Sequence, residues 1–99
     1  MSANNQEEYS SALAFAAVRN YYENKLNNMR RRIQFNIGRL NNIQRELANL
    51  EASRLPRPRN EKAERILQLK TKIEEVQETI RKLEEEEQTL QSWVDQSYL

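Results

Sequence analysis

The chain has 99 residues, of which 37% are hydrophobic and 31% are charged, and its formal net charge is +1. So few apolar residues suit long amphipathic helices, each burying one narrow stripe, better than a compact globule. One Gly and two Pro are too few for a protein of strands and turns, and the length limits the chain to a single domain.

The sequence contains neither Cys nor His. Without Cys it cannot form a disulfide framework, an iron–sulfur cluster or a zinc finger, and without His it lacks the usual general base and the commonest metal ligand. The carboxylates occur in runs such as Glu84 to Glu87, which are typical of a solvated helix face. We therefore expect a protein that is not an enzyme and that uses no cofactor or metal.

Near the start of the chain, seven consecutive apolar residues run from Ala12 to Val18. This run is shorter than the ~20 residues that span a bilayer. Glu7 and Glu8 precede it, where a signal peptide would be basic. We therefore expect a soluble, intracellular (cytoplasmic) protein without a signal peptide or transmembrane segment. Asn5 and Glu8 resemble a capping box, which predicts that the first helix begins near Glu7.

Residues 1–17 form the apolar start of this first helix, and residues 18–53 continue it. Residues 54–60 are predicted to be a hinge, because Pro56 and Pro58 cannot donate backbone hydrogen bonds. Asn60 suits the N-cap of a second helix within residues 61–99, predicted to run from about Glu61 to Gln96.

In both helices one stripe of residues recurs at alternating spacings of four and three, which is the pattern of a coiled-coil seam. The stripe of the first helix comprises Tyr22, Leu26, Met29, Ile33, Asn36, Leu40, Ile43, Leu47 and Leu50. The stripe of the second helix comprises Ile66, Leu69, Ile73, Val76, Ile80, Leu83, Glu87, Leu90 and Val94.

Folding the chain back at Pro58 places the two stripes opposite each other, with Leu40 facing Val76 and Leu47 facing Leu69. The expected fold is all-α: a long antiparallel helical hairpin, that is, a two-helix coiled coil. A lone hairpin leaves much apolar surface in water, so we expect it to dimerise into a four-helix bundle or to join a larger helical assembly.

Polar residues help to define this register. Glu46 is expected to face Lys72 across the seam. Asn36 lies opposite a core position and needs a hydrogen-bond partner, while Glu87 can extend its carboxylate towards the solvent. Asn36 is interpreted as a structural residue that specifies register or oligomer state. Glu87 is also interpreted as structural, in preference to a ligand or a proton site.

In this register Leu99 faces residue 17, so the residues before Ala17 have no partner within the chain. Aromatic residues gather at the same end. The predicted protein-interaction residues are Leu13, Phe15, Tyr21, Tyr22, Trp93 and Tyr98. The alternative is that the aromatic residues only seal the end of the hairpin.

A second surface follows from a repeat: the segment "LNNMRR" that begins at Leu26 recurs two heptads later as "LNNIQR" at Leu40. Both copies present the same helix face, which lacks carboxylates and contains Gly38, a residue that costs ~1 kcal/mol relative to Ala in a helix. A tight helix contact, nucleic-acid backbone or mere Asn-rich composition each accounts for this face. The candidate nucleic-acid-binding residues are Asn27, Asn28, Arg31, Gln34, Asn41, Asn42 and Arg45.

The sequence therefore predicts a non-enzymatic assembly or adaptor protein that acts through helix-mediated protein–protein interaction. Its expected partner is itself, as a homo-oligomer, or another helical protein, and no membrane partner is expected. The alternative is a small helical protein that binds the backbone of duplex RNA or DNA. A third hypothesis is an inhibitor that docks on a nucleic-acid-binding partner.

Overall fold

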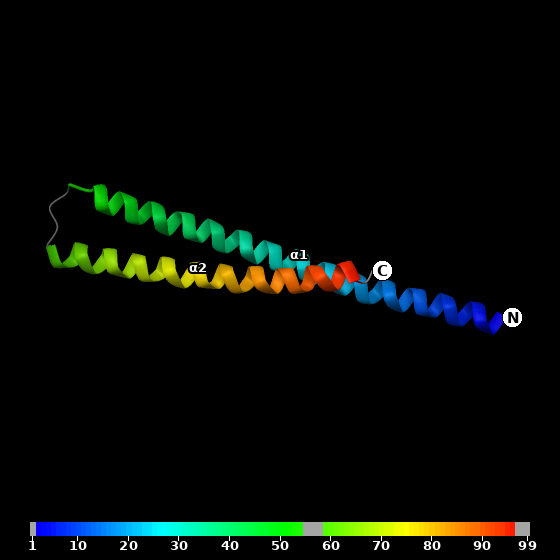
Figure 1. Cartoon of the computed structure of the whole chain (residues 1–99). Helices are drawn as coiled ribbons and strands as arrows, with labels where there is room; N and C mark the ends of the chain where they lie inside the picture. Colours follow the sequence, from blue (N-terminus) through cyan, green and yellow to red (C-terminus); the bar gives the residue numbers. More distant parts are fainter. Residues whose placement is uncertain (1, 55–58, 97–99) are drawn as a thin grey trace. The chain divides into compact units, whose positions relative to one another are not determined.

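The computed structural model describes the backbone of residues 2–54 and 59–96 and the side chains of residues 12–54 and 60–96. The described residues form two helices, α1 (Ser2–Ala52) and α2 (Arg59–Gln96), and no strand (Figure 1). The two helices pair as an antiparallel hairpin, which confirms the predicted all-α fold. In the described residues, neither helix is apolar over a length that would cross a bilayer.

The start of α1 differs from the prediction. The helix begins at Ser2 rather than near Glu7, so Asn5 lies inside it and is not an N-cap. Neither Pro nor Gly occurs in this part of the chain to end the helix, so it continues through the Asn5 and Glu8 pair.

The other ends lie close to the predicted positions. After Ala52, the Ser53 backbone N–H donates to the Leu50 carbonyl at 3.2 Å, which tightens the last turn of α1. α2 begins at Arg59, so Asn60 is its second residue and not a cap that precedes it. Pro56 and Pro58 of the predicted hinge lie outside the described residues.

The chain divides into two compact units, and each contains a stretch of both helices. We call residues 32–84 the proximal unit, and residues 1–31 with 85–99 the terminal unit.

The core of the proximal unit is apolar. Leu69 is 1% exposed and is the most deeply buried side chain in its cluster. The cluster consists of Ile43, Leu50, Leu69, Val76 and Ile80, with Ile37, Leu40, Leu47, Ile66 and Ile73 packed against it. The residues of the two predicted layers, Leu40 with Val76 and Leu47 with Leu69, thus belong to one cluster.

Polar contacts join α1 to α2 within the proximal unit. The Lys62 Nζ donates to the Ser53 carbonyl at 3.1 Å, and the Arg65 Nη2 lies 2.5 Å from the Glu46 Oε1. The predicted partner of Glu46 was Lys72, which holds the equivalent position one heptad further along α2. Arg65 takes this role instead, and its guanidinium also donates to Gln68 at 3.4 Å.

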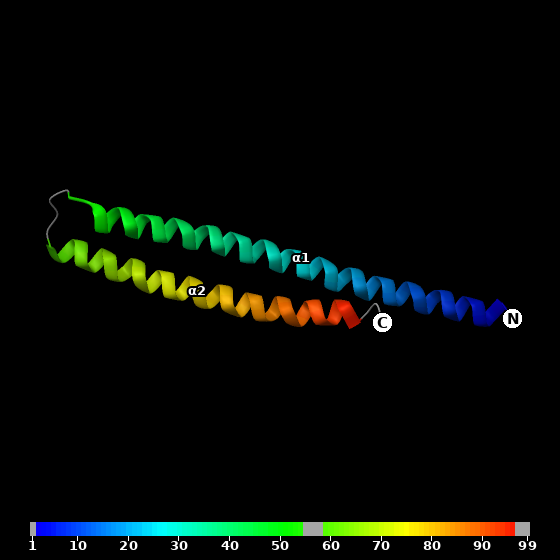
Figure 2. The same cartoon turned by 45° about the horizontal axis from the view of Figure 1, so that its top comes forward.

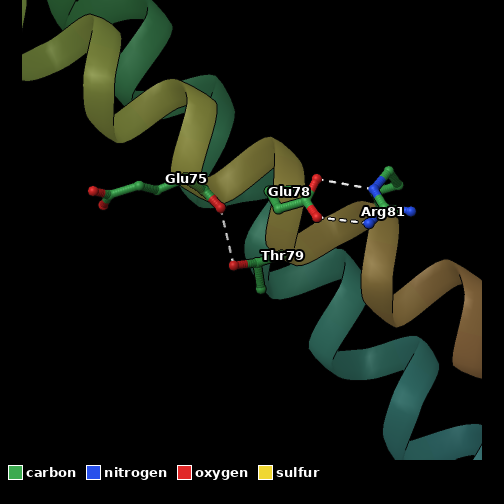
Figure 3. A network of polar contacts seen from close by, with 4 residues as sticks. All are labelled: Glu75, Glu78, Thr79 and Arg81. Carbon is green, nitrogen blue, oxygen red and sulfur yellow. Dashed lines mark hydrogen bonds and ion pairs between the residues drawn. The ribbon is translucent and has the colours of Figure 1, made fainter.

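Asn36, the polar member of the first stripe, is half-buried and forms a hydrogen bond within α1. Its Nδ2 donates to the Arg32 carbonyl at 2.8 Å, one turn earlier in α1. Thr79 makes the same kind of bond in α2, from its hydroxyl to the Glu75 carbonyl at 3.0 Å (Figure 3). Such local bonds let polar side chains sit within a helix without a partner across the seam.

The terminal unit has a smaller core, in which Leu26 and Val94 are buried. Within this unit the N-terminal stretch of α1 continues past the end of α2 at Gln96, as both views show (Figures 1 and 2). This stretch of α1 is therefore left without a paired helix.

Candidate protein-interaction surface

Three aromatic side chains meet in the terminal unit. The Tyr22 ring lies 5.4 Å from the Trp93 ring and 5.5 Å from the Tyr21 ring, centroid to centroid, and both pairs are edge-to-face. Tyr22 is half-buried, whereas Tyr21 is 56% exposed and Trp93 is 48% exposed. Tyr22 thus joins α1 to α2 while its two aromatic neighbours face the solvent.

A cation extends this cluster. The Lys25 Nζ lies 5.2 Å from the centroid of the Tyr21 ring, within the range of a cation–π contact. The sequence-based prediction missed Lys25. Its position four residues after Tyr21, one turn along the same face, is the signal that would have found it.

We call residues 12–18 the overhang. Its larger side chains are in water: Phe15 is 72% exposed, Leu13 54% and Val18 50%. Phe15 lies one heptad before Tyr22 and so continues the core stripe of α1, whereas the helical period places Leu13 on the opposite side. The overhang is therefore apolar around its whole circumference, which is typical of a helix enclosed by other elements.

The structure thus places five of the six predicted interaction residues. Tyr21, Tyr22 and Trp93 are in contact, and Leu13 and Phe15 lie in the overhang of the same unit. Tyr98 lies outside the described residues. Two further large apolar side chains are exposed in the proximal unit, Phe35 at 72% and Leu67 at 66%.

A polar groove also lies in the terminal unit. The Arg30 Nη2 donates to the Gln91 Oε1 at 2.6 Å, and the Gln91 Nε2 donates to the Asp95 Oδ1 at 2.9 Å. With half-buried Glu87, these residues line an open hollow of about 400 Å³. This relay links α1 to α2. No group of three or more potential ligand residues in the described part of the chain is arranged to hold a metal ion.

The acid-free face of α1 is exposed to solvent. In the terminal unit it comprises the exposed residues Asn27, Asn28 and Arg31. In the proximal unit it comprises the exposed residues Gln34, Phe35, Gly38, Asn41, Asn42 and Arg45. A Cβ added at Gly38 meets nothing within 4 Å, so packing within the chain does not explain this glycine.

The chain was compared with protein families, characterised proteins and solved structures, and none matched. Its function is therefore inferred from the two exposed surfaces of α1 and from the aromatic cluster.

Proposed function

We propose that the protein is a non-enzymatic coiled-coil assembly or adaptor protein that acts through helix-mediated contacts at the terminal unit. The observation that carries this proposal is the set of exposed large apolar side chains gathered there: Leu13, Phe15, Val18, Tyr21 and Trp93. Exposed apolar patches of this kind mark interaction surfaces in soluble proteins. Trp and Tyr are also the residues that most often dominate binding energy at interfaces.

The exposed area supports the same proposal. The chain exposes 8101 Å² of solvent-accessible surface. A folded monomer of 11.8 kDa is expected to expose about 5,900 Å². The difference is larger than the ~800 Å² that each partner buries in a standard interface. An assembly would thus bring the exposed area closer to that of an ordinary folded protein.

The proposed partner is a helical protein, either this chain itself or another, because long heptad stripes pair with helices. We place the protein in the cytoplasm and assign it no membrane partner. Apolar contact, and not charge, is expected to supply most of the affinity, since residues 12–18 contain no charged side chain.

The test compares Phe15→Ala with Phe35→Ala. Both side chains are 72% exposed and both lie on α1, so either truncation removes the same chemistry at a similar cost to the isolated chain. We expect Phe15→Ala to lower the mass of the assemblies, measured by light scattering for the purified protein and by size-exclusion chromatography with detection of this chain in native extracts, and Phe35→Ala to leave it unchanged. Unchanged assemblies with Phe15→Ala would refute the proposal.

A second candidate function, binding of duplex RNA or DNA, is favoured by one observation. Arg31 and Arg45 are exposed on a face without carboxylates, and neither forms an ion pair within the described residues. Against it stand the exposed Phe35 and the net charge of only +1. Titration of both duplexes at two salt concentrations, with wild type and with Arg31→Ala/Arg45→Ala, separates the candidates because phosphate contacts set the salt slope. The same titration, repeated with a nucleic-acid-binding partner present, tests the inhibitor hypothesis.

A further inference from the structure

We propose that the partner at the terminal unit is a second copy of this chain, docked about a two-fold axis. The overhang of each copy packs against Trp93 and Tyr21 of the other copy. This inference rests on the proposed function and deepens it by naming the partner.

The exposed stripe of the overhang continues the contact between α1 and α2. Phe15 continues the stripe that includes Tyr22 and Leu26, and Tyr22 already contacts Trp93 of α2. Beyond the end of α2 at Gln96 this stripe is exposed, although it has the residue spacing of a seam. A helix that continues the α2 side of this seam is amphipathic and antiparallel to α1, as α2 is. The α1 helix of a second copy meets both conditions.

The overhang has no charged side chain, which favours contact with an identical chain. In a two-fold interface each residue near the axis faces its own equivalent, so any charged residue there meets a like charge. Residues 12–18 form a run of α1 without a charged side chain, whereas Arg19 follows it directly and Glu23 lies four residues further on. The overhang is thus the stretch of the terminal unit in which two copies meet without repulsion.

The overhang has apolar side chains on opposite sides of α1, and both sides need to be covered. Leu13 and Phe15 lie on opposite sides of α1, so one partner helix cannot cover both. Two-fold docking gives the overhang two neighbours: the overhang of the other copy and its aromatic cluster. In return it covers the exposed halves of Trp93 and Tyr21. One two-fold contact therefore covers both the overhang and the aromatic side chains, so the dimer is closed and does not extend into a filament.

The chain itself supplies the experiment, because it has one Trp and no Cys. One copy carries Trp93→Phe and Ala14→Cys, with a nitroxide quencher on the new thiol. It is mixed with unlabelled wild-type chain. All tryptophan emission then comes from the unlabelled copy, so quenching reports contact between two chains. The matched control carries the label at Ala48→Cys, which is likewise an exposed alanine of α1 but belongs to the proximal unit.

At equal mixing about half of the wild-type chains have a labelled partner, so the Ala14 label should lower emission by up to about half. The Ala48 label should lower it little. Light scattering of each labelled protein should give the mass of two 11.8 kDa chains.

Three results would overturn the dimer: a single-chain mass at all concentrations, a dimer without quenching from the Ala14 label, or equal quenching from both labels. A single-chain mass leaves the proposed function standing, because a different helical protein can then occupy the same surface. The proposed function fails separately, when Phe15→Ala leaves every assembly in native extracts unchanged.

Discussion

Glu78 and Arg81 form an ion pair with two hydrogen bonds on the surface of α2 (Figure 3). The Arg81 Nε donates to one carboxylate oxygen at 2.9 Å and the Nη2 donates to the other at 2.6 Å. These hydrogen bonds are the main reason why the pKa of Glu78 lies below its usual value of 4.5. Desolvation, the next largest effect, opposes this shift, while the positive charges of Arg81 and Lys82 each lower the pKa by a smaller amount.

The lowered pKa of Glu78 leads to a prediction about pH. Because the folded pKa is below the unfolded one, the unfolded chain binds more protons in the acidic range, and the pair stabilises the fold only while Glu78 is ionised. Its contribution is present above the unfolded pKa and is lost as the pH falls through the folded pKa. The difference in melting temperature between wild type and Arg81→Gln should therefore be present at neutral pH and should shrink below about 4.5.

An NMR titration of the Glu78 carboxyl checks the cause directly. Arg81→Gln removes both the hydrogen bonds and a charge, so the pKa should rise towards 4.5. Lys82→Gln is the matched control, because it removes a nearby charge but no hydrogen bond, and it should raise the pKa less. A larger rise with Lys82→Gln would contradict the assignment.

At the scale of the helix, α2 contains a matched pair of leucines two positions apart. Leu69 points into the core and is 1% exposed, while Leu67 is 66% exposed. We expect Leu69→Ala to lower the free energy of unfolding by about 2–5 kcal/mol, because it removes buried methyl groups and leaves a cavity. Leu67→Ala should change it by less than about 0.5 kcal/mol. Urea denaturation measures both, and similar losses from the two variants would show that the core stripe is misplaced.

The elements also show how far the sequence determines the fold. The heptad spacing correctly predicted the burial of Leu69 and Val76, because one narrow stripe per helix leaves a single way to bury apolar side chains. The start of α1 was mispredicted, since a capping box marks a helix end only when the residues before it cannot continue the helix. The partner of Glu46 was mispredicted because long side chains reach along the seam as well as across it.

Only part of the candidate surface could be predicted, because residue spacing indicates which side chains lie near one another but not how they contact. Helical spacing and the register indicated that Tyr21, Tyr22 and Trp93 would lie near one another, and the ring contacts confirm it. Spacing does not determine how rings orient or which cation approaches them, so the edge-to-face packing and the Lys25 contact required the structure. Whether this surface binds a partner remains a prediction, as does the role of the acid-free face.

At the scale of the whole molecule, the two units differ in how far apart along the chain their contacting residues lie. The bond from Lys62 to Ser53 in the proximal unit joins residues 9 positions apart. The bond from Arg30 to Gln91 in the terminal unit joins residues 61 positions apart. Closing the longer loop in an otherwise unfolded chain costs about 2 kcal/mol more conformational entropy.

This difference implies an order of folding. The proximal unit is expected to fold first, because it closes a short loop, and the helices of the terminal unit are expected to pair afterwards. The terminal unit is then also the first to unfold locally. Amide hydrogen exchange, measured on dilute protein below the concentration at which it assembles, should show faster exchange at Leu26 and Val94 than at Leu69 and Val76. Equal protection of both units from amide exchange would contradict this order of folding. If this order holds, the segment proposed to bind a partner is also the last to fold, so binding would stabilise the folded terminal unit.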